Sequence, residues 1–271
     1  MKHDDGYALV TVVWMMALLS LSALGFSQTT RLEMTAGANE WQQARIRSIA
    51  DGGVHRAIAV LLAGEAGHRQ NLVFADDHLR VSLEDLAGRV DLNAAPVDLI
   101  AFVLETLDLS PGRALSLAQR LADYRDADDL RRLNGLETED YRHLGLSHAP
   151  RNGPLLDLSE LDRIPGYNDL LIGRLTPLAT VHSGARGVVA ERAAPALAEA
   201  LESAAIPGRW RDARQGRVWS VTATVEDPTG TRFSREAVVW LPASGNRRYR
   251  ILRWRQAGLA AAPDRSANPP G

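Results

Sequence analysis

The chain has 271 residues, of which 45% are hydrophobic, and its formal net charge at pH 7 is -2. This length and composition exclude an intrinsically disordered chain and predict one or two globular units. The absence of cysteine excludes disulfide bonds, thiolate zinc sites and cysteine nucleophiles. The charge is uneven, because residues 76–140 hold fifteen acidic residues and seven arginines, whereas residues 209–255 hold four acidic residues and eleven arginines. The middle of the chain should therefore repel polyanions.

An uncharged run extends from Tyr7 to Phe26, and its only polar side chains are Thr11, Ser20 and Ser22. As a helix this run would be about 30 Å long, which matches the hydrocarbon layer of a membrane. A cleaved secretory signal would have a shorter apolar core and a cleavage site of small residues, and no such site follows. A buried core helix would carry a polar stripe. The run therefore predicts a permanent transmembrane anchor at residues 7–26.

The six residues before the anchor, MKHDDG, are polar and end in Gly6. They resemble the leader of type IV pilin-like proteins, which a prepilin peptidase cleaves after the glycine on the cytoplasmic face. The resemblance implies a leader of residues 1–6 and a cut between Gly6 and Tyr7. Thr11 would then be the fifth residue of the mature chain, where most pilins carry a glutamate that is costly in lipid. In lacking this glutamate, the sequence resembles one family of minor pseudopilins, protein K of the type II secretion system, which sits at the pseudopilus tip.

Beyond the anchor the chain alternates between helical and strand patterns. Apolar residues recur at helical spacing as far as Leu62, which predicts that the first helix continues through residues 27–65. Residues 66–93 are expected to form the first strands, with a β-hairpin around Ala87 and Gly88, and residues 206–256 the C-terminal antiparallel strands. Residues 94–205 predict an inserted helical block, and residues 257–271, rich in Ala and Pro, a disordered tail.

Several short motifs in this order resemble the protein K family. They are NAAPVDL at residues 93–99, LADYRDADD at residues 121–129, RNGPLLDLSEL at residues 151–161 and the C-terminal YRILRW. The resemblance implies an α+β fold: a pilin-like fold with a long N-terminal transmembrane helix, an antiparallel sheet and a large inserted α-helical domain.

Acidic residues gather where the helical pattern ends after Tyr124. The proposed ligands are Asp123, Asp126, Asp128 and Glu137, with Asp129 nearby, and Ca²⁺ takes six to eight oxygen ligands in loose geometry. The resemblance adds to this interpretation, since members of the protein K family are expected to hold calcium in this region. The alternative is a solvated charge run paired with Arg125, Arg131 and Arg132.

A nucleic-acid function is the competing hypothesis. Residues 104–121, LETLDLSPGRALSLAQRL, have the rhythm of a helix-hairpin-helix motif, and a membrane-anchored version would resemble a DNA-uptake protein. That motif binds phosphate through backbone N–H groups of a Gly-x-Gly hairpin. Here the hairpin reads Asp108-Leu109-Ser110, so both glycines are missing, and the surrounding acidic charge opposes DNA binding. We therefore expect no nucleic-acid partner.

The seven histidines show no metal-ligand spacing, and no nucleophile elbow, P-loop or dinucleotide fingerprint is present, so we expect no enzymatic activity. The resemblance implies a minor pseudopilin that helps to initiate and cap the pseudopilus tip for protein secretion. Its expected partners are the prepilin peptidase, the other minor pseudopilins of the tip complex and the major pseudopilin. Its expected location is the cell inner membrane, crossed once, with the C-terminal bulk in the periplasm.

Overall fold

The computed structural model describes residues 5–67, 69–74, 78–204, 208–210, 218–226, 230–242 and 248–257. Within these ranges, the side chains of residues 5–8, 23–39 and 209 are not described. Most of the predicted leader and nearly all of the predicted tail, residues 258–271, therefore lie outside the described residues.

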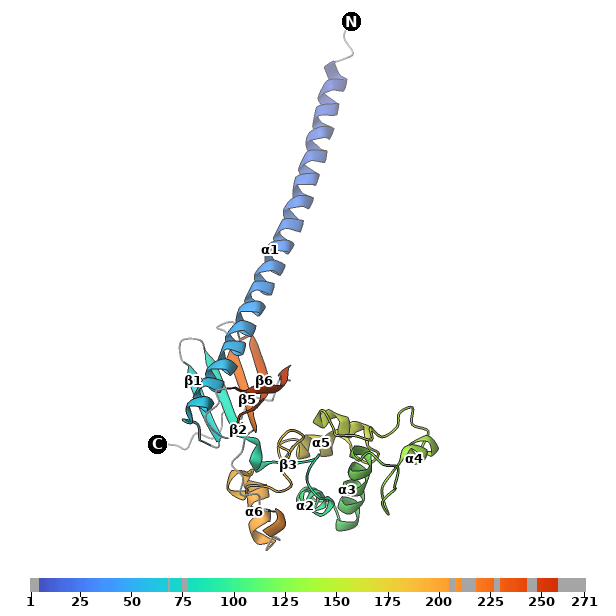
Figure 1. Cartoon of the computed structure of the whole chain (residues 1–271). Helices are drawn as coiled ribbons and strands as arrows, with labels where there is room; N and C mark the ends of the chain where they lie inside the picture. The colour runs from blue at the N-terminus through green and yellow to red at the C-terminus, as the bar shows by residue number, and fades with distance from the viewer. Residues whose placement is uncertain are drawn as a thin grey trace, which may run out of the picture.

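The longest element is helix α1 (Asp5–Ala63), which projects far beyond the rest of the molecule (Figure 1). Its 59 residues correspond to a length of about 90 Å. Among its described side chains, the buried ones lie in its C-terminal part, in a stripe with helical spacing that comprises Ile46, Ala50, Val54, Ala57, Ile58 and Leu61. The prediction of a helix reaching about Leu62 is confirmed.

The buried stripe of α1 packs on one face of a five-stranded antiparallel sheet of order β1-β2-β5-β6-β7. The strands are β1 (Arg69–Phe74), β2 (Leu79–Asp85), β5 (Val218–Glu226), β6 (Arg232–Trp240) and β7 (Arg250–Gln256). Alternation along β5 places Val221, Ala223 and Val225 in the core beneath α1. Gly53 lets the helix approach closely, since a Cβ there would lie 2.8 Å from a methyl group of Leu79. The last three strands form the predicted antiparallel meander.

The predicted hairpin around Ala87 and Gly88 is wrong. Strand β2 ends at Asp85, residues 86–88 form a 3-10 turn, and the short β3 (Val90–Asp91) pairs in parallel with β4 (Ala179–Thr180). The Asp85 carboxylate accepts hydrogen bonds from the Ala87 N–H and from the guanidinium of Arg192. Gly88 lies directly against the backbone of Arg192, because an added Cβ would be 2.1 Å from its carbonyl oxygen. These contacts turn the chain out of the sheet, where the pattern of alternation alone suggested a return strand.

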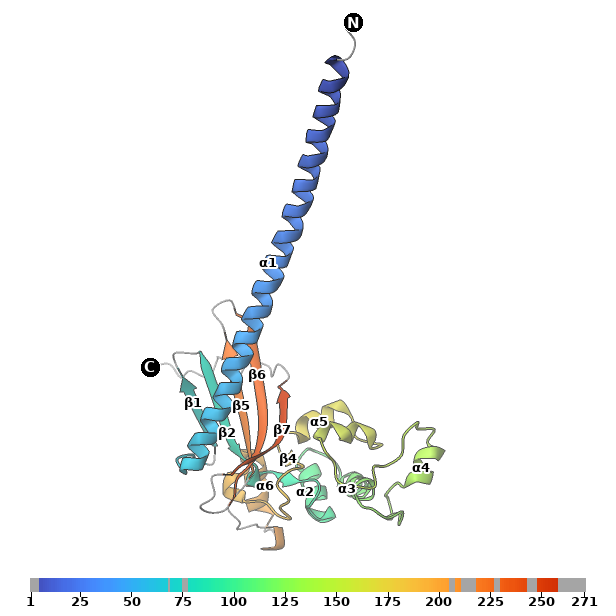
Figure 2. The same ribbon diagram turned by 45° about the horizontal axis from the view of Figure 1, so that its top comes forward.

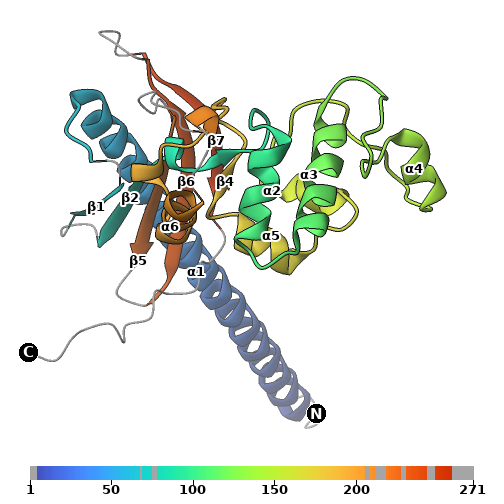
Figure 3. The ribbon, with the colours of Figure 1, turned by 90° about the horizontal axis from the view of Figure 1, so that it is seen from below.

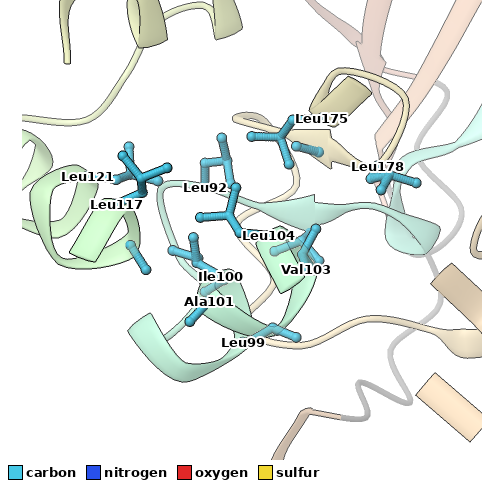
Figure 4. Packing of buried hydrophobic residues seen from close by; sticks show 14 of the residues in the cluster. Leu92, Leu99, Ile100, Ala101, Val103, Leu104, Leu117, Leu121, Leu175 and Leu178 are labelled. Carbon is cyan, nitrogen blue, oxygen red and sulfur yellow. The ribbon is translucent and has the colours of Figure 1, made fainter. Parts of the chain in front are cut away.

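A helical unit fills the chain between β2 and β5 and lies at the end of the sheet away from the N-terminus of α1 (Figures 1 and 2). Its helices are α2 (Val97–Glu105), α3 (Pro111–Arg125), α4 (Thr138–His143), α5 (Asp169–Leu175) and α6 (Pro195–Ser203). The core of this unit is separate from that of the sheet and is rich in leucine, as the packing of Leu99, Leu104, Leu117 and Leu175 shows (Figure 4).

Asn93 holds three segments of the helical unit together. Its side-chain amide donates to the carbonyl oxygens of Leu155 and Val181, at 2.9 and 3.0 Å, and its side-chain oxygen accepts the Leu155 N–H at 2.8 Å. The preceding Asp91 accepts the N–H groups of Asn93, Ala94 and Gly184. The asparagine of the NAAP motif is therefore an architectural residue, since it satisfies buried backbone groups far apart in sequence.

Ion pairs fasten the helical unit to the sheet. Arg192 meets the buried Asp85 at the exit from β2, and Arg253 of β7 meets Asp157 of the helical unit. The backbone of Arg192 also lies directly against Gly88, where the chain leaves the sheet. The helical unit is thus held in a defined position beside the sheet.

Candidate functional site

The acidic residues singled out in the sequence lie at the end of α3 and in the loop that leads to α4. Asp123 is in the last turn of α3 and has no exposed surface, while Asp126 ends that helix. Glu137 immediately precedes α4 and is only 6% exposed. The burial of a carboxylate at each end of this loop is unusual, since such groups are rarely buried without compensation.

Arg132 provides part of that compensation. Its guanidinium donates to both Asp123 and Asp126, the latter at 2.6 Å, and its backbone N–H donates to Asp123 at 3.2 Å. The loop lies so tightly over Asp123 that a Cβ at Gly135 would be 1.6 Å from a carboxylate oxygen. Only glycine fits at this position of the loop.

Glu137 has less compensation. It is the N-cap residue of α4 and forms a capping box with Asp140, but neither of its buried carboxylate oxygens completes a hydrogen bond with the described residues. Burial raises the pKa of Glu137 from 4.5 to about 7, and the negative charges of Asp123 and Asp126 act in the same direction. Burial also raises the pKa of Asp123, although its bonds to Arg132 oppose this shift. The site therefore has an excess of negative charge, centred on Glu137, that a cation would neutralise.

The remaining predicted ligands are turned elsewhere. Asp128 is exposed and accepts the backbone N–H of Leu130 at 2.9 Å, while Asp129 accepts the side-chain amide of Asn152 at 3.2 Å. Within the described part of the chain, no group of three or more His, Asp or Glu side chains is arranged to hold a metal ion. A cation at Glu137 would have to share Asp123 and Asp126 with Arg132, which already binds both.

The three arginines expected to pair with this cluster behave differently. Arg132 pairs with it as described, and Arg131 meets Asp140 at 2.9 Å. The pairing expected for Arg125 is wrong, because its guanidinium donates instead to the carbonyl oxygens of Leu92 and Ala95. Sequence proximity suggested the ion pair, but the backbone carbonyls before α2 lie nearer to the end of α3. A guanidinium with several fixed donors suits such a position.

The hairpin of the DNA-binding hypothesis lies between α2 and α3. Asp108 adopts a left-handed conformation with φ of 65°, and its side chain is 86% exposed and paired with Arg174 at 2.7 Å. A carboxylate therefore stands at the turn where a phosphate would have to approach backbone N–H groups. This arrangement gives no support to phosphate binding.

The residues predicted to matter for processing and assembly lie in α1. Gly6 and Tyr7 belong to its first turns, although their side chains are outside the described set, and Thr11 is exposed on the helix. The side chains of residues 9–22 are all exposed, including Leu9, Trp14, Met15, Leu18 and Leu21. A search of the described residues finds no helix with the length and apolar character needed to cross a membrane.

The fold matches that of a solved protein chain. A chain in the crystal structure of the GspK-GspI-GspJ complex from the type 2 secretion system of enterotoxigenic Escherichia coli superposes with a TM-score of 0.62. The two chains are 16% identical, and the match covers 83% of this chain and 99% of that one. The protein therefore shares the fold of the solved chain. In this protein, a long helix and an antiparallel sheet carry a large helical unit.

Sequence comparison finds similarity to one family. Residues 80–184 match the family model described as Type II secretion system (T2SS), protein K. The chain is 31% identical over 176 residues to the type II secretion system protein K of Klebsiella pneumoniae, covering 63% of this chain and 48% of that protein. It is 27% identical over 208 residues to that of Pseudomonas aeruginosa, covering 66% and 62%. The chain therefore spans about half of the length of the first relative and about three fifths of the length of the second. Its resemblance to the protein K family is confirmed.

Proposed function

We propose that this protein is a minor pseudopilin of the type II secretion system, which helps to initiate and cap the tip of the pseudopilus. The observation that carries the proposal is the placement of a large helical unit beside the sheet, at the end away from the N-terminus of a long helix (Figure 1). The confirmed resemblance to the protein K family supports it. The role is structural, and we propose no enzymatic activity.

The anchor is the run from Tyr7 to Phe26, whose uncharged sequence has the length of a membrane span. The proposal rests on this sequence and on the exposure of side chains 9–22. A prepilin peptidase would cut between Gly6 and Tyr7, leaving the helix in the inner membrane and the sheet and helical unit in the periplasm. The anchor would then be available to pack against the helices of sibling subunits.

The tip position follows from bulk and from charge. In an assembly built of parallel α1 helices, the helical unit would occupy the space beyond the end of the sheet that lies away from the N-terminus of α1 (Figures 1 and 2). The next subunit would otherwise sit in this space. Thr11 offers no carboxylate to the amino terminus of an incoming subunit. Both features favour a protein that ends the assembly and joins the other minor pseudopilins from one side only. The solved relative was crystallised in a complex of GspK, GspI and GspJ, which supports partners of this kind.

The mature N-terminus tests the anchor and its processing. Mass spectrometry of the protein from cells with the prepilin peptidase should find Tyr7 as the first residue. Cells that lack the peptidase should retain Met1 or Lys2 at the N-terminus. A soluble product cut after Ser20 or later would show instead that the run is a secretory signal, and the proposal would fail.

We also propose that the acidic cluster binds Ca²⁺ through Glu137, Asp123 and Asp126. The support is the pair of buried carboxylate oxygens of Glu137 that lack a hydrogen-bond partner among the described residues. A divalent cation would supply the positive charge that this site lacks, and would draw Asp126 away from Arg132. Calcium should therefore stabilise the fold by binding the native state alone.

The calcium proposal is tested by thermal unfolding of the full chain with and without a chelator. The chelator should lower the melting temperature, and Asp126→Ala and Glu137→Ala should each abolish this effect. The exposed Glu199→Gln in α6 is the control and should keep it. An unchanged melting temperature of the wild-type chain on chelation would remove the calcium site from the account.

A further inference from the structure

Two leucines stand out on the surface of the helical unit. Leu133 is 89% exposed and Leu130 is 77% exposed, and these are the two most exposed large hydrophobic side chains among the described residues. Both lie in the segment from Asp126 to Glu137 that connects α3 to α4, which we call the leucine loop. Neither belongs to the hydrophobic core of the helical unit. Folding therefore does not explain them.

The leucine loop is held in shape by polar contacts at its base. Arg132 binds Asp123 and Asp126, and the backbone and side-chain amides of Asn134 both donate to the side-chain oxygen of Gln119 at 3.0 Å. The Gly135 N–H donates to the Arg132 carbonyl oxygen at 3.0 Å. A loop fixed in this way presents its leucines without having to be ordered on binding, which lowers the entropic cost of an interface.

The position of the loop suits a partner approaching from outside the pseudopilin assembly. Figure 3 shows α4 at the outer end of the helical unit, with the connection from α3 running out to it, away from α1 and the sheet. Among the described residues, the hydrophobic core shared by α1 and the sheet contains no residue of the leucine loop. The loop is thus remote from the surfaces that α1 would use to pack against sibling helices.

The charge beside the leucines indicates the chemistry of the partner. Asp128 and Asp129 precede Leu130, both are exposed, and their printed contacts are to a backbone N–H and to the Asn152 amide, which are neutral. Within the described residues, neither carboxylate forms a salt bridge. Arg131 and Arg132, which lie between the two leucines, are paired with Asp140 and with Asp123 and Asp126, so the unpaired charge beside the leucines is negative. A surface with an apolar centre and a negative border complements one with an apolar pocket and a basic border. An anionic membrane would instead be repelled by these two carboxylates.

We propose that the leucine loop is a docking site for a partner protein whose apolar pocket is bordered by lysine or arginine, with Leu130 and Leu133 as the inserted side chains. This inference goes beyond the pseudopilin function and does not depend on it. It names a second interaction surface, distinct from α1, at the opposite end of the molecule.

The test uses a fluorescent synthetic peptide of about 15 residues that forms an amphipathic helix of leucine and lysine. Fluorescence anisotropy measures its affinity for the full chain in nanodiscs of phosphatidylcholine. The double variant Leu130→Gln, Leu133→Gln should bind at least about tenfold more weakly, because the two inserted side chains carry the contact. Leu170→Gln is the matched control, since Leu170 is 74% exposed on α5, and it should bind within about twofold of the wild type.

A second peptide, with glutamate in place of lysine, tests the preference for a basic partner. It should bind at least about tenfold more weakly than the lysine peptide. The variants should unfold at the wild-type temperature, because the replaced leucines are exposed. Equal peptide affinity for the wild type and the double variant would overturn the proposal, as would an equal loss in Leu170→Gln. Vesicles of phosphatidylcholine and phosphatidylglycerol that bind the chain only when both leucines are present would also overturn it, by identifying a membrane as the partner.

Discussion

Glu137 gives the acidic cluster a predictable dependence on pH. Its pKa in the folded protein is raised from 4.5 to about 7 by burial and by neighbouring carboxylates. Between these two values the unfolded chain releases the Glu137 proton, whereas the folded chain keeps it. Stability must therefore fall as the pH rises through this window, and the loss is complete above pH 7. At about 1.4 kcal/mol for each pKa unit, the difference between 4.5 and 7 corresponds to about 3 kcal/mol.

Glu137→Gln removes this titration while keeping the shape of the side chain. The variant should gain up to about 3 kcal/mol of unfolding free energy relative to the wild type at pH 8, and nothing of this kind at pH 4.5. The measurement is denaturant unfolding of the full chain in a non-ionic detergent, followed by circular dichroism at both pH values with a chelator present. Glu199→Gln, at an exposed position of α6, is the control and should leave the pH dependence unchanged.

The result that would refute this reasoning is a Glu137→Gln variant whose unfolding free energy keeps the wild-type dependence on pH. The titrating group would then lie elsewhere. Calcium adds a second check, because saturating Ca²⁺ should stabilise the wild type at pH 8 and have little effect on Glu137→Gln. Ionised Glu137 is the form that would bind the cation.

Three further substitutions probe the frame that carries the site. Asn93→Ala should lower the unfolding free energy by about 2–4 kcal/mol, because it leaves buried backbone groups of Leu155 and Val181 without partners. Chemical denaturation measures this loss, and a loss under about 1 kcal/mol would contradict the prediction. Gly88→Ala should cost about 3 kcal/mol or more by forcing a Cβ against the backbone of Arg192, and a wild-type melting temperature would contradict the close contact. Arg192→Met should cost about 3–5 kcal/mol, because it removes the guanidinium partner of the buried Asp85, whereas the double change with Asp85→Leu should recover much of this loss.

The elements that the sequence predicted well are those whose pattern is set locally. The stripe from Ile46 to Leu61 has strict helical spacing, so α1 could be placed to within a residue of its C-terminal end. Alternation in residues 218–226 and 232–240 identified β5 and β6, since one face of each strand is buried beneath α1.

The elements that were missed depend on contacts between distant residues. The 3-10 turn at residues 86–88 forms because Asp85 meets Arg192, more than one hundred residues away, and no local pattern records that pair. The same holds for Arg125, whose partners are carbonyl oxygens before α2. In the acidic cluster, sequence proximity could not show that Arg132 pairs with Asp123 and Asp126 and not with Glu137, or that Asp128 is exposed and turned elsewhere.

The central claim is that this chain joins other minor pseudopilins through α1. The most direct measurement is native mass spectrometry of the complex purified from membranes of cells that express this protein with its partner minor pseudopilins. The account predicts one copy of this chain with one copy of each partner, and loss of the complex when α1 residues 9–22 are replaced by an unrelated membrane span. A chain that is recovered only alone, or that binds its partners equally well with the replaced span, would contradict it.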